Sequence, residues 1–394
     1  MKKTGIIMVS NHNEIGGATK SMLSLANKLN ETSKICVITP HKKNVYEYCK
    51  KNNIFVVVIP YIPYLIADSS SKINSFVRHI LKPILIFFHN IVNFISVKYA
   101  HKYIDFDNYQ IIHTNMIRDD FGMQLAKKYN KKHIMHLREF GNIDYKYIYL
   151  KKEYIKYIDK GTNLFIAISD SIKEHYINKG ISEYKLKRIY NGVDVDNIVI
   201  KNSAFLNEGL IKIIFTGGIT ENKGQADLIN AMKNLPKEIQ KKIIVDFYGK
   251  EDEKYVNYLK KIISEEKIMS KINFKGYVSN INELLCNYDI GMMCSVSEAF
   301  GRTTIEYMAA GLVVIASNKG ANNELIKDNI NGIIYNKDNL ESLSNILKHI
   351  ANSEIDLSNI SQNAIKYSRK NFSSDLNAKN IFNEYLKING GENE

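Results

Sequence analysis

Residues 297–311 have the sequence Ser297-Glu298-Ala299-Phe300-Gly301-Arg302-Thr303-Thr304-Ile305-Glu306-Tyr307-Met308-Ala309-Ala310-Gly311. An apolar run over residues 289–294 precedes this segment and predicts a buried strand. Residues 303–310 predict a short helix that ends at Gly311, a typical C-cap glycine. Residues 312–316 predict the next parallel strand. Glu298 is therefore expected in a strand-to-helix loop and Glu306 on the helix that follows.

This arrangement has chemical consequences. A helix N-terminus opened by glycine presents backbone N–H groups and the positive end of the helix dipole, which favours a phosphate. Carboxylates on both sides accept hydrogen bonds from several hydroxyl groups. A diphosphate between a sugar and a ribose would meet both requirements. The alternative is a solvated helix with two ordinary surface glutamates, but the strand–loop–helix–strand context favours the functional interpretation.

The segment resembles the motif of the retaining glycosyltransferases of family 4, which use nucleotide sugars and have the two-domain GT-B fold. That motif is Glu-x-Phe-Gly, a second glutamate after seven intervening residues, and Ala-x-Gly at the helix end, and every position is filled here. The resemblance implies that Glu298 contacts the donor sugar and that Glu306 binds the ribose. The donor contacts expected between them are Phe300, Gly301, Arg302 and Thr303.

The length of 394 residues predicts two domains. Strands alternate with helices in both halves, which indicates two doubly wound, Rossmann-like α/β domains, and the GT-B resemblance implies that they face each other across a cleft. We expect an N-terminal, acceptor-side domain over residues 1–199 and a C-terminal, nucleotide-sugar-binding domain over residues 200–373, with a linker at 200–209. The resemblance also implies that a final helix, residues 374–390, packs back on the N-terminal domain.

The second domain opens with a strand at 211–215 and a turn that contains Gly217, Gly218 and Lys223. A lysine next to a glycine before a helix can reach a phosphate held by the backbone, although a solvent-exposed lysine is the alternative. In the family this turn carries an arginine and a Lys-Gly pair that hold the diphosphate. Lys223 matches, but Gly218 stands in the arginine position. Either Lys223, the helix dipole and the backbone amides suffice, or Arg302 or Arg138 substitutes.

Further site residues are expected in three other segments. The resemblance places the nucleobase against the turn that carries Tyr277 and Val278. It also implies that Gly16 and Gly17, after the first strand, contact the donor phosphate or the acceptor, although a tight turn that needs glycine fits equally well. A dinucleotide site is excluded because the chain lacks GxGxxG and an acid at the end of the second strand.

A strand over residues 134–139 ends with His136 and Arg138. Ligands of open α/β sheets collect beyond the carboxyl ends of the strands. A lone histidine there is more often structural, but the family has a histidine at this position, which implies that His136 contacts the donor sugar. Arg138 would meet phosphate or acceptor unless its neighbour Glu139 neutralises it.

Charge is distributed unevenly along the chain. The net charge of +13 lies wholly in residues 1–199, which contain 30 Lys+Arg and 17 Asp+Glu, whereas residues 200–394 contain 24 of each. A basic domain attracts polyanions, anionic lipid surfaces or phosphate-bearing substrates, and a merely soluble surface is the alternative. Its lysines are not interleaved with aromatic residues, so we expect no nucleic-acid partner.

The apolar segment 76–97 is too interrupted by polar residues and Pro83 for a transmembrane helix. We favour a buried helix pair. The alternative is a helix at a membrane interface, with Arg78, Lys82 and Lys98 facing the headgroups. Together with the basic N-terminal domain, this alternative would make the protein a peripheral membrane protein.

Four cysteines without metal-ligand spacing fit a reducing cytoplasm, and the apolar start of the chain is too short for a signal peptide. We expect a cytoplasmic protein, placed peripherally on the inner face of the membrane if the interface helix forms. The segments near the motif contain no DxD-type metal site, so no metal and no cofactor is expected beyond the nucleotide-sugar substrate.

The sequence therefore predicts a retaining hexosyl- or N-acetylhexosaminyltransferase. It would move a sugar from a UDP- or GDP-linked donor to a hydroxyl of a glycan or polyprenyl-linked acceptor, in the synthesis of a bacterial capsule, O-antigen or exopolysaccharide. The expected catalytic residues are Glu298, His136 and Lys223. The resemblance implies a front-face reaction, and double displacement is disfavoured because Glu306 is assigned to the ribose. The alternatives are a non-catalytic nucleotide-sugar or glycan-binding protein and a GT-B nucleotide-sugar epimerase.

Overall fold

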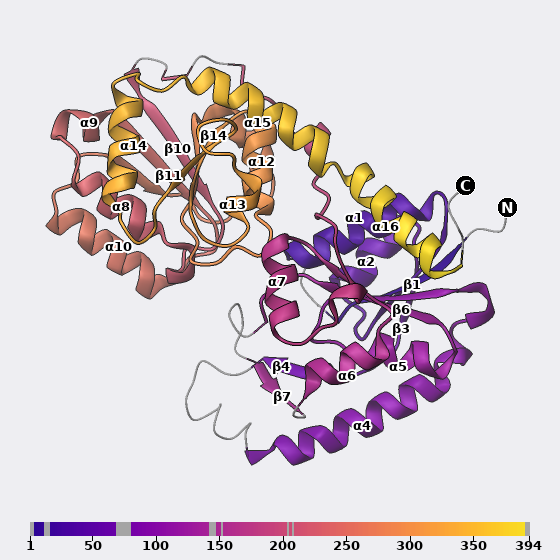
Figure 1. The fold of residues 1–394 in the computed structure, drawn as a ribbon. Helices are drawn as coiled ribbons and strands as arrows, with labels where there is room; N and C mark the ends of the chain where they lie inside the picture. The colour runs from indigo at the N-terminus through magenta and orange to yellow at the C-terminus, as the bar shows by residue number, and fades with distance from the viewer. Residues whose placement is uncertain are drawn as a thin grey trace. The chain divides into compact units, whose positions relative to one another are not determined.

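The computed structural model describes residues 4–11, 16–67, 80–141, 147–150, 153–202, 205–206 and 209–390. The chain forms two compact units (Figure 1). Unit 1 contains residues 1–192 and 374–394, and unit 2 contains residues 193–373. Each unit is built on a parallel sheet with helices on its faces. The predicted α/β fold class is therefore confirmed.

Unit 1 has a seven-stranded parallel sheet in the order β3-β2-β1-β5-β6-β8-β9, and a separate antiparallel pair of β4 and β7. The strands are β1 (Gly5–Val9), β2 (Lys34–Thr39), β3 (Phe55–Val58), β4 (Leu65–Ala67), β5 (Ile111–Thr114), β6 (Lys132–Leu137), β7 (Tyr147–Tyr149), β8 (Leu164–Ala167) and β9 (Leu186–Arg188). The helices are α1 (Gly17–Asn30), α2 (Asn44–Lys51), α4 (Lys82–Tyr99), α5 (Phe121–Lys128), α6 (Tyr154–Gly161), α7 (Asp170–Asn178) and α16 (Ser374–Ile388).

Both faces of the unit 1 sheet are buried, as the continuous apolar strands require. In β1, Ile6 and Met8 belong to one core cluster, which includes residues of α1 and α16. Ile7 and Val9 belong to another cluster on the opposite face, with residues of α4 and α5. Successive residues of a strand point to opposite faces, so one short apolar run supplies both cores.

Unit 2 has a six-stranded parallel sheet in the order β12-β11-β10-β13-β14-β15. The strands are β10 (Ile211–Thr216), β11 (Ile243–Tyr248), β12 (Lys271–Phe274), β13 (Ile290–Met293), β14 (Val313–Ser317) and β15 (Ile333–Tyr335). The helices are α8 (Gln225–Lys233), α9 (Lys237–Lys242), α10 (Glu253–Glu265), α11 (Ile281–Leu284), α12 (Arg302–Ala310), α13 (Asn322–Leu325), α14 (Glu341–Ala351) and α15 (Leu357–Phe372).

The strand–loop–helix–strand arrangement predicted around the Glu298 motif is present as β13, α12 and β14. Gly301 precedes α12 and Gly311 follows it, both with left-handed backbone angles of φ 85° and 82°. The Gly311 N–H donates to Met308 O at 3.1 Å, as expected of a C-cap glycine. The two glycines therefore set both ends of the helix that carries Glu306.

The chain passes from unit 1 to unit 2 between Gly192 and Val193, ahead of the boundary expected at 199/200. The Val193 N–H donates to Phe372 O at 2.8 Å, and the buried side chains of Lys201 and Asp289 form an ion pair at 3.1 Å. The first residues of the expected linker are therefore bound to unit 2, and residues 203–204 and 207–208 lie outside the described ranges. The final helix, α16, belongs to unit 1, where it packs beside α1 (Figure 1).

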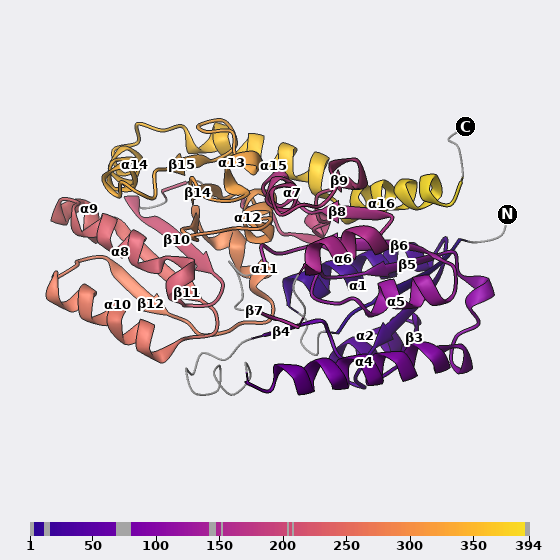
Figure 2. The same cartoon turned by 60° about the horizontal axis from the view of Figure 1, so that its bottom comes forward.

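The expectation of a buried helix pair at residues 76–97 is wrong. Residues 76–79 lie outside the described ranges, and most of the remainder forms one helix, α4, which runs along the edge of unit 1 beside α5 (Figure 2). His89, Asn93 and Val97 are its buried residues, whereas most of its large apolar side chains are exposed. The helical periodicity of the sequence predicts that the two faces of the helix differ in polarity. It does not predict which face packs against the rest of the protein.

Candidate functional site

The loop after β13 holds Glu298 beside Lys223. Lys223 Nζ lies 3.4 Å from Glu298 Oε2, and the Gly301 N–H donates to Glu298 Oε1 at 3.2 Å. The side chain of Glu298 is 16% exposed, so it is fixed but still open to solvent. A carboxylate has about four acceptor sites, and these two contacts leave capacity for hydroxyl donors.

The backbone of Glu298 rests on the turn after β14. The Ala321 N–H donates to Glu298 O at 2.8 Å, and a Cβ at Gly320 would lie 2.4 Å from the same oxygen. Gly320 also has a positive φ of 60°. Any side chain at residue 320 would therefore displace the loop that carries the carboxylate.

Lys223 is positioned by the glycine that follows it. Lys223 ends a short 3-10 turn, and Gly224, with φ 74°, begins α8. A Cβ at Gly224 would lie 2.2 Å from Cys294 O, and the Val296 N–H donates to Asn222 O at 3.1 Å. The Lys-Gly pair thus lets this turn pack directly against the end of β13, which brings Lys223 to Glu298 across the sequence.

The first turn of α12 carries a cation, Arg302, and the next turn carries the second carboxylate, Glu306. Arg302 Nε donates to Glu306 Oε1 at 3.0 Å, and the two side chains are 27% and 16% exposed. The Gly301 N-cap supplies no side-chain oxygen, and Thr303, one residue into the helix, is half-buried. This helix N-terminus therefore combines backbone amides and a guanidinium, both of which stabilise an anion.

The other predicted donor contacts of unit 2 differ in exposure. The Phe300 ring is buried and lies 6.1 Å from the Phe372 ring, so the side chain serves packing and only the backbone is left for a ligand. Tyr277, in the loop after β12, is 75% exposed, and Val278 beside it is half-buried. A Cβ at Gly217, which follows β10, would meet no described residue within 4 Å.

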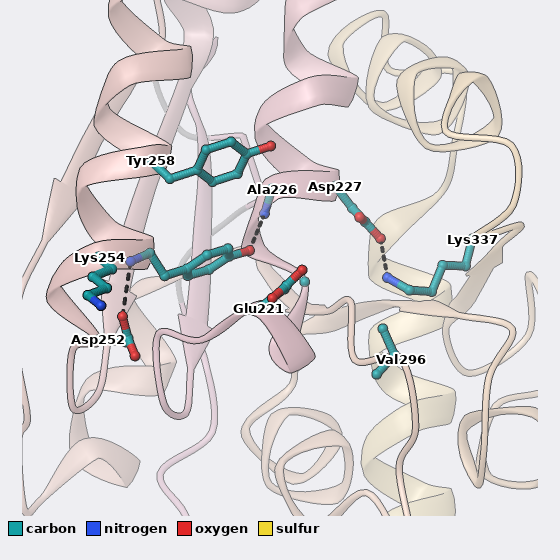
Figure 3. Close-up of a pocket in the computed structure, with 10 residues that line it drawn as sticks. Glu221, Ala226, Asp227, Asp252, Lys254, Tyr258, Val296 and Lys337 are labelled. Carbon is teal, nitrogen blue, oxygen red and sulfur yellow. Dashed lines mark hydrogen bonds and ion pairs between the residues drawn. The ribbon is translucent and has the colours of Figure 1, made fainter. Parts of the chain in front are cut away.

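A cavity of about 640 Å³ opens between α8 and α10 (Figure 3). The Tyr255 hydroxyl accepts from the Ala226 N–H at 3.1 Å, and Glu221, Tyr258 and Lys337 also line the cavity. None of the predicted donor residues lines it, because Lys223 turns to Glu298 while Glu221, in the same turn, faces the cavity. Among the described residues, no three His, Cys, Asp or Glu side chains gather as a metal site requires.

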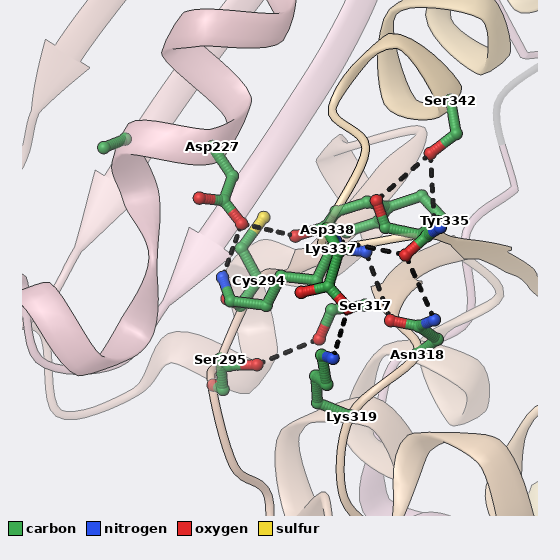
Figure 4. A network of polar contacts seen from close by, with 12 residues as sticks. Asp227, Cys294, Ser295, Ser317, Asn318, Lys319, Tyr335, Lys337, Asp338 and Ser342 are labelled. Atoms are coloured by element: carbon green, nitrogen blue, oxygen red, sulfur yellow. Dashed lines mark hydrogen bonds and ion pairs between the residues drawn. The ribbon is translucent and has the colours of Figure 1, made fainter.

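A polar network anchors the start of the Glu298 loop (Figure 4). Lys337 Nζ donates to Asp227 Oδ2 at 2.5 Å and to Cys294 O at 2.9 Å. The Tyr335 hydroxyl donates to the same Asp227 oxygen at 2.9 Å. These bonds connect α8 to the ends of β13 and β15. They hold in place the residue from which the Glu298 loop begins.

In unit 1, His136 belongs to a buried chain of hydrogen bonds. His136 Nδ1 lies 3.1 Å from His113 Nε2 and 3.1 Å from Arg138 Nη2, and His113 Nδ1 lies 2.5 Å from the Tyr385 hydroxyl. His136 is fully buried, yet its Nε2 has no hydrogen-bond partner among the described residues. A buried polar atom without a partner is rare and indicates a place for a ligand or water.

The contacts define which nitrogen of His136 carries the proton. Burial, and next the charge of Arg138, hold the pKa values of His113 and His136 well below their usual value, so both rings are neutral. A guanidinium only donates, so His136 Nδ1 must accept and the proton is on Nε2. His113 then donates from Nε2 and accepts from Tyr385. The open nitrogen of His136 is therefore a hydrogen-bond donor.

Arg138 is held inside unit 1 by side-chain oxygens. Its Nε donates to Asn115 Oδ1 at 2.8 Å, and its Nη1 donates to Asn191 Oδ1. His113, Asn115 and Tyr385 are not among the site residues predicted from the sequence. No local pattern marks Tyr385, which is 272 positions from His113.

Gly16 and Gly17 are not required by the local fold. Gly16 has φ −80° as the N-cap of α1, and Gly17 is absent from the positive-φ residues of the described chain. A Cβ on either would meet no described residue within 4 Å. In the same unit, Ser10 Oγ and Asn11 Nδ2, just after β1, are buried without partners among the described residues. Among the described residues, the space beside both glycines is therefore open.

Two protein families match the chain. Residues 15–197 match Glycosyltransferase Family 4, and residues 196–367 match Glycosyl transferases group 1. The uncharacterized glycosyltransferase MJ1178 of Methanocaldococcus jannaschii is 26% identical over 341 residues, 84% of this chain and 90% of that protein. The lipopolysaccharide 1,6-galactosyltransferase of Salmonella typhimurium is 26% identical over 201 residues, 48% of this chain and 53% of that protein.

The fold matches solved structures over almost the whole chain. Anabaena Alr3699/HepE, crystallised in complex with UDP and glucose, superposes with a TM-score of 0.76 at 19% identity, covering 98% of this chain and 100% of that chain. That likeness establishes the GT-B fold, and the two family matches together extend over residues 15–367. The chain therefore belongs to the group 1 glycosyltransferases.

Proposed function

We propose that the protein transfers a sugar, a hexose or an N-acetylhexosamine, from a UDP- or GDP-linked donor to a hydroxyl of a glycan or lipid-linked acceptor, with retention at the anomeric carbon. The observation that carries this proposal is the pair of carboxylates, Glu298 and Glu306, each beside a cation at the N-terminus of α12. Relatives support it, since one acts on lipopolysaccharide and HepE binds UDP and glucose. We extend the proposal to bacterial surface polysaccharide synthesis.

In this proposal the N-terminus of α12 binds the diphosphate, with Lys223 and Arg302 as its cations. Glu306 binds the ribose hydroxyls and Glu298 the sugar hydroxyls. Tyr277 and Val278 are assigned to the nucleobase. The exposed ring of Tyr277 offers a stacking surface for a base.

The reaction proposed is a front-face transfer. The acceptor oxygen forms a bond to the anomeric carbon while the bond between the anomeric carbon and the diphosphate oxygen breaks. The acceptor proton passes to that leaving phosphate oxygen. Charge develops on that phosphate, and preorganised donors such as Lys223 and the α12 amides stabilise it. His136 donates from Nε2 to a sugar oxygen, and Gly16 and Gly17 let the substrate approach the backbone of unit 1.

We propose a cytoplasmic location, because all four cysteines lie in the described ranges and carry free thiols. We infer no metal requirement for donor binding, since the two cations beside the carboxylates are the counter-charges assigned to the diphosphate. Addition of a chelator is then expected to leave the transfer rate unchanged.

The test replaces Glu298 with glutamine, which keeps the size of the side chain and removes its charge. A panel of UDP and GDP sugars, screened by thermal shift, first identifies the donor, since a ligand of the folded state raises apparent stability. Glu298→Gln is then expected to lower kcat about a hundredfold, because the sugar loses its orientation.

Glu253→Gln, which changes an exposed acid of unit 2, is the matched control. NMR of the product's anomeric proton tests retention.

The same assay separates the alternatives. Equal transfer by Glu298→Gln and the unaltered protein would remove Glu298 from the mechanism. Donor binding without any transfer would indicate a binding protein, for which the glycine at the family's arginine position gives a reason. An epimerised sugar formed without acceptor would indicate an epimerase.

A further inference from the structure

The outward face of α4 is apolar, whereas its buried residues are two polar side chains, His89 and Asn93, and one apolar side chain, Val97, unlike an ordinary surface helix. Phe87, Phe88 and Phe94 are 60%, 52% and 67% exposed. Ten of the nineteen large apolar side chains exposed in the described residues belong to residues 80–103, namely Ile80, Leu81, Ile84, Phe87, Phe88, Ile91, Phe94, Ile95, Tyr99 and Tyr103. A contiguous apolar surface of this kind marks an interaction site.

The inward face of α4 is fixed to unit 1 by polar bonds. His89 Nε2 lies 3.1 Å from Asp120 Oδ1, and the Asn93 side chain bonds to both the carbonyl and the N–H of Ile62, at 3.0 and 2.9 Å. The Tyr129 hydroxyl donates to Val97 O at 2.8 Å. These buried bonds hold the helix in one orientation, so the apolar face cannot rotate inward.

The charged side chains of residues 80–104 are all positive. Lys82, Lys98 and Lys102 flank it, and residues 80–104 contain no Asp or Glu. Lys98 and Lys102 both lie over the Tyr99 ring, at 5.4 and 4.8 Å from its centroid. A second copy of this chain would present the same lysines and would repel them, whereas anionic lipid headgroups would pair with them.

Within the described ranges one helix, residues 82–102, is long and apolar enough to cross a membrane. Only 22% of its most apolar 18-residue stretch is buried. The bonds to Asp120 and Ile62 hold this helix along the side of unit 1 (Figure 2). We propose that α4 lies flat on an anionic lipid bilayer, with its phenylalanines among the acyl chains and its lysines at the headgroups. This docking brings unit 1 to the surface where a lipid-linked acceptor would reside.

The chain contains no tryptophan, so one introduced tryptophan reports on a single position. Phe94→Trp in the full chain is expected to shift its emission to the blue on vesicles of phosphatidylcholine and phosphatidylglycerol. The shift should weaken on pure phosphatidylcholine and in high salt, because the lysines then lose their counter-charges. Tyr184→Trp, 83% exposed in unit 1, is the matched control and should show no shift.

A second variant tests the apolar face itself. Phe87→Asp combined with Phe94→Asp is expected to lower vesicle binding in flotation at least about tenfold, since the charges oppose insertion. The double variant should keep the melting temperature, because both side chains are exposed, whereas Tyr184→Asp should bind as before. No donor or acceptor is present, so failure here is distinct from failure of the proposed transfer.

Three results would overturn the proposal. Vesicle binding that the two aspartates leave unchanged would remove α4 from the contact. Equal binding to neutral and anionic vesicles would remove the role of the lysines. Sedimentation of the protein as a dimer that Phe94→Asp dissociates, without vesicle binding, would make this face an interface between two copies of the chain.

Discussion

Arg302 and Gly218 together determine how the diphosphate would be held. Arg302 lies in the first turn of α12, next to Glu306, and its side chain is 27% exposed. Arg138, the other substitute considered, is buried and bonded to two asparagines of unit 1. We therefore assign Arg302 as the cation that replaces the arginine missing at Gly218.

The prediction at this scale is that Arg302→Ala weakens donor binding about tenfold, since a hydrogen bond to a charged group contributes roughly 1.5–3 kcal/mol. Arginine fits at residue 218, because its φ is not positive and a Cβ there would make ordinary contacts at 3.7 and 3.9 Å. Gly218→Arg is therefore expected to restore affinity to Arg302→Ala. Calorimetric titration with the donor measures both, and a double variant as weak as Arg302→Ala would contradict the assignment.

At the scale of elements, α16 acts on the candidate site through one hydroxyl. Tyr385 is fully buried on α16 and bonds to His113, which in turn donates to His136. Tyr385 is thus a positioning residue, since it fixes the proton of His113 without touching a substrate. Helix α16 therefore contributes a buried hydrogen bond to the candidate site as well as packing to unit 1.

Tyr385→Phe is expected to lower kcat while the donor affinity changes little. Without the hydroxyl, His113 Nδ1 loses its donor, so the proton of His113 is no longer confined to Nε2 and the bond that His113 donates to His136 weakens, whereas Arg138 still holds the His136 proton on Nε2. The nitrogen-15 chemical shifts of His113 report its tautomer directly, which a purely structural loss would leave unchanged. Tyr184→Phe, an exposed tyrosine, is the matched control. A normal kcat with a mixed tautomer would show that the proton position does not matter for transfer.

At the scale of the whole molecule, unit 1 combines the basic charge, the apolar helix and three buried neutral histidines. Burial lowers the pKa of His133 to about 3, and burial together with the Arg138 charge lowers the pKa values of His113 and His136. Below about pH 6.5 the unfolded chain binds protons that these folded histidines do not, so stability is lost as the pH falls. Each histidine lowers the free energy of unfolding by about 1.4 kcal/mol for each pH unit of this fall.

One buried acid opposes this trend. Burial raises the pKa of Asp119 to about 7, so the folded state keeps a proton between about pH 4 and 7 that the unfolded chain releases. As the pH falls, three histidines lower the free energy of unfolding and one aspartate raises it. The net loss of stability is about 3 kcal/mol per pH unit. Urea unfolding of the full chain, followed by a probe in unit 1, should show this fall between pH 6 and 4.5. His133→Gln should flatten the slope, with His101→Gln at an exposed site as control; an unchanged slope would contradict the account.

Contiguous patterns were enough to predict most of unit 2. The Glu298 motif, the Lys223–Gly224 turn and the caps of α12 each lie within a few residues, so local backbone rules and one motif describe them. The same rules gave the alternation of strands and helices, because apolar periodicity depends on neighbours along the chain.

Long-range packing determined the rest. The position of the His113 proton depends on Tyr385, 272 positions away, and the contact of Lys223 with Glu298 depends on the packing of Gly224 against Cys294. In α4 the periodicity separates a polar face from an apolar one, but Asp120 and Ile62 select the polar face for burial. A sequence records what each side chain prefers, and partners distant in the chain determine which preference is met.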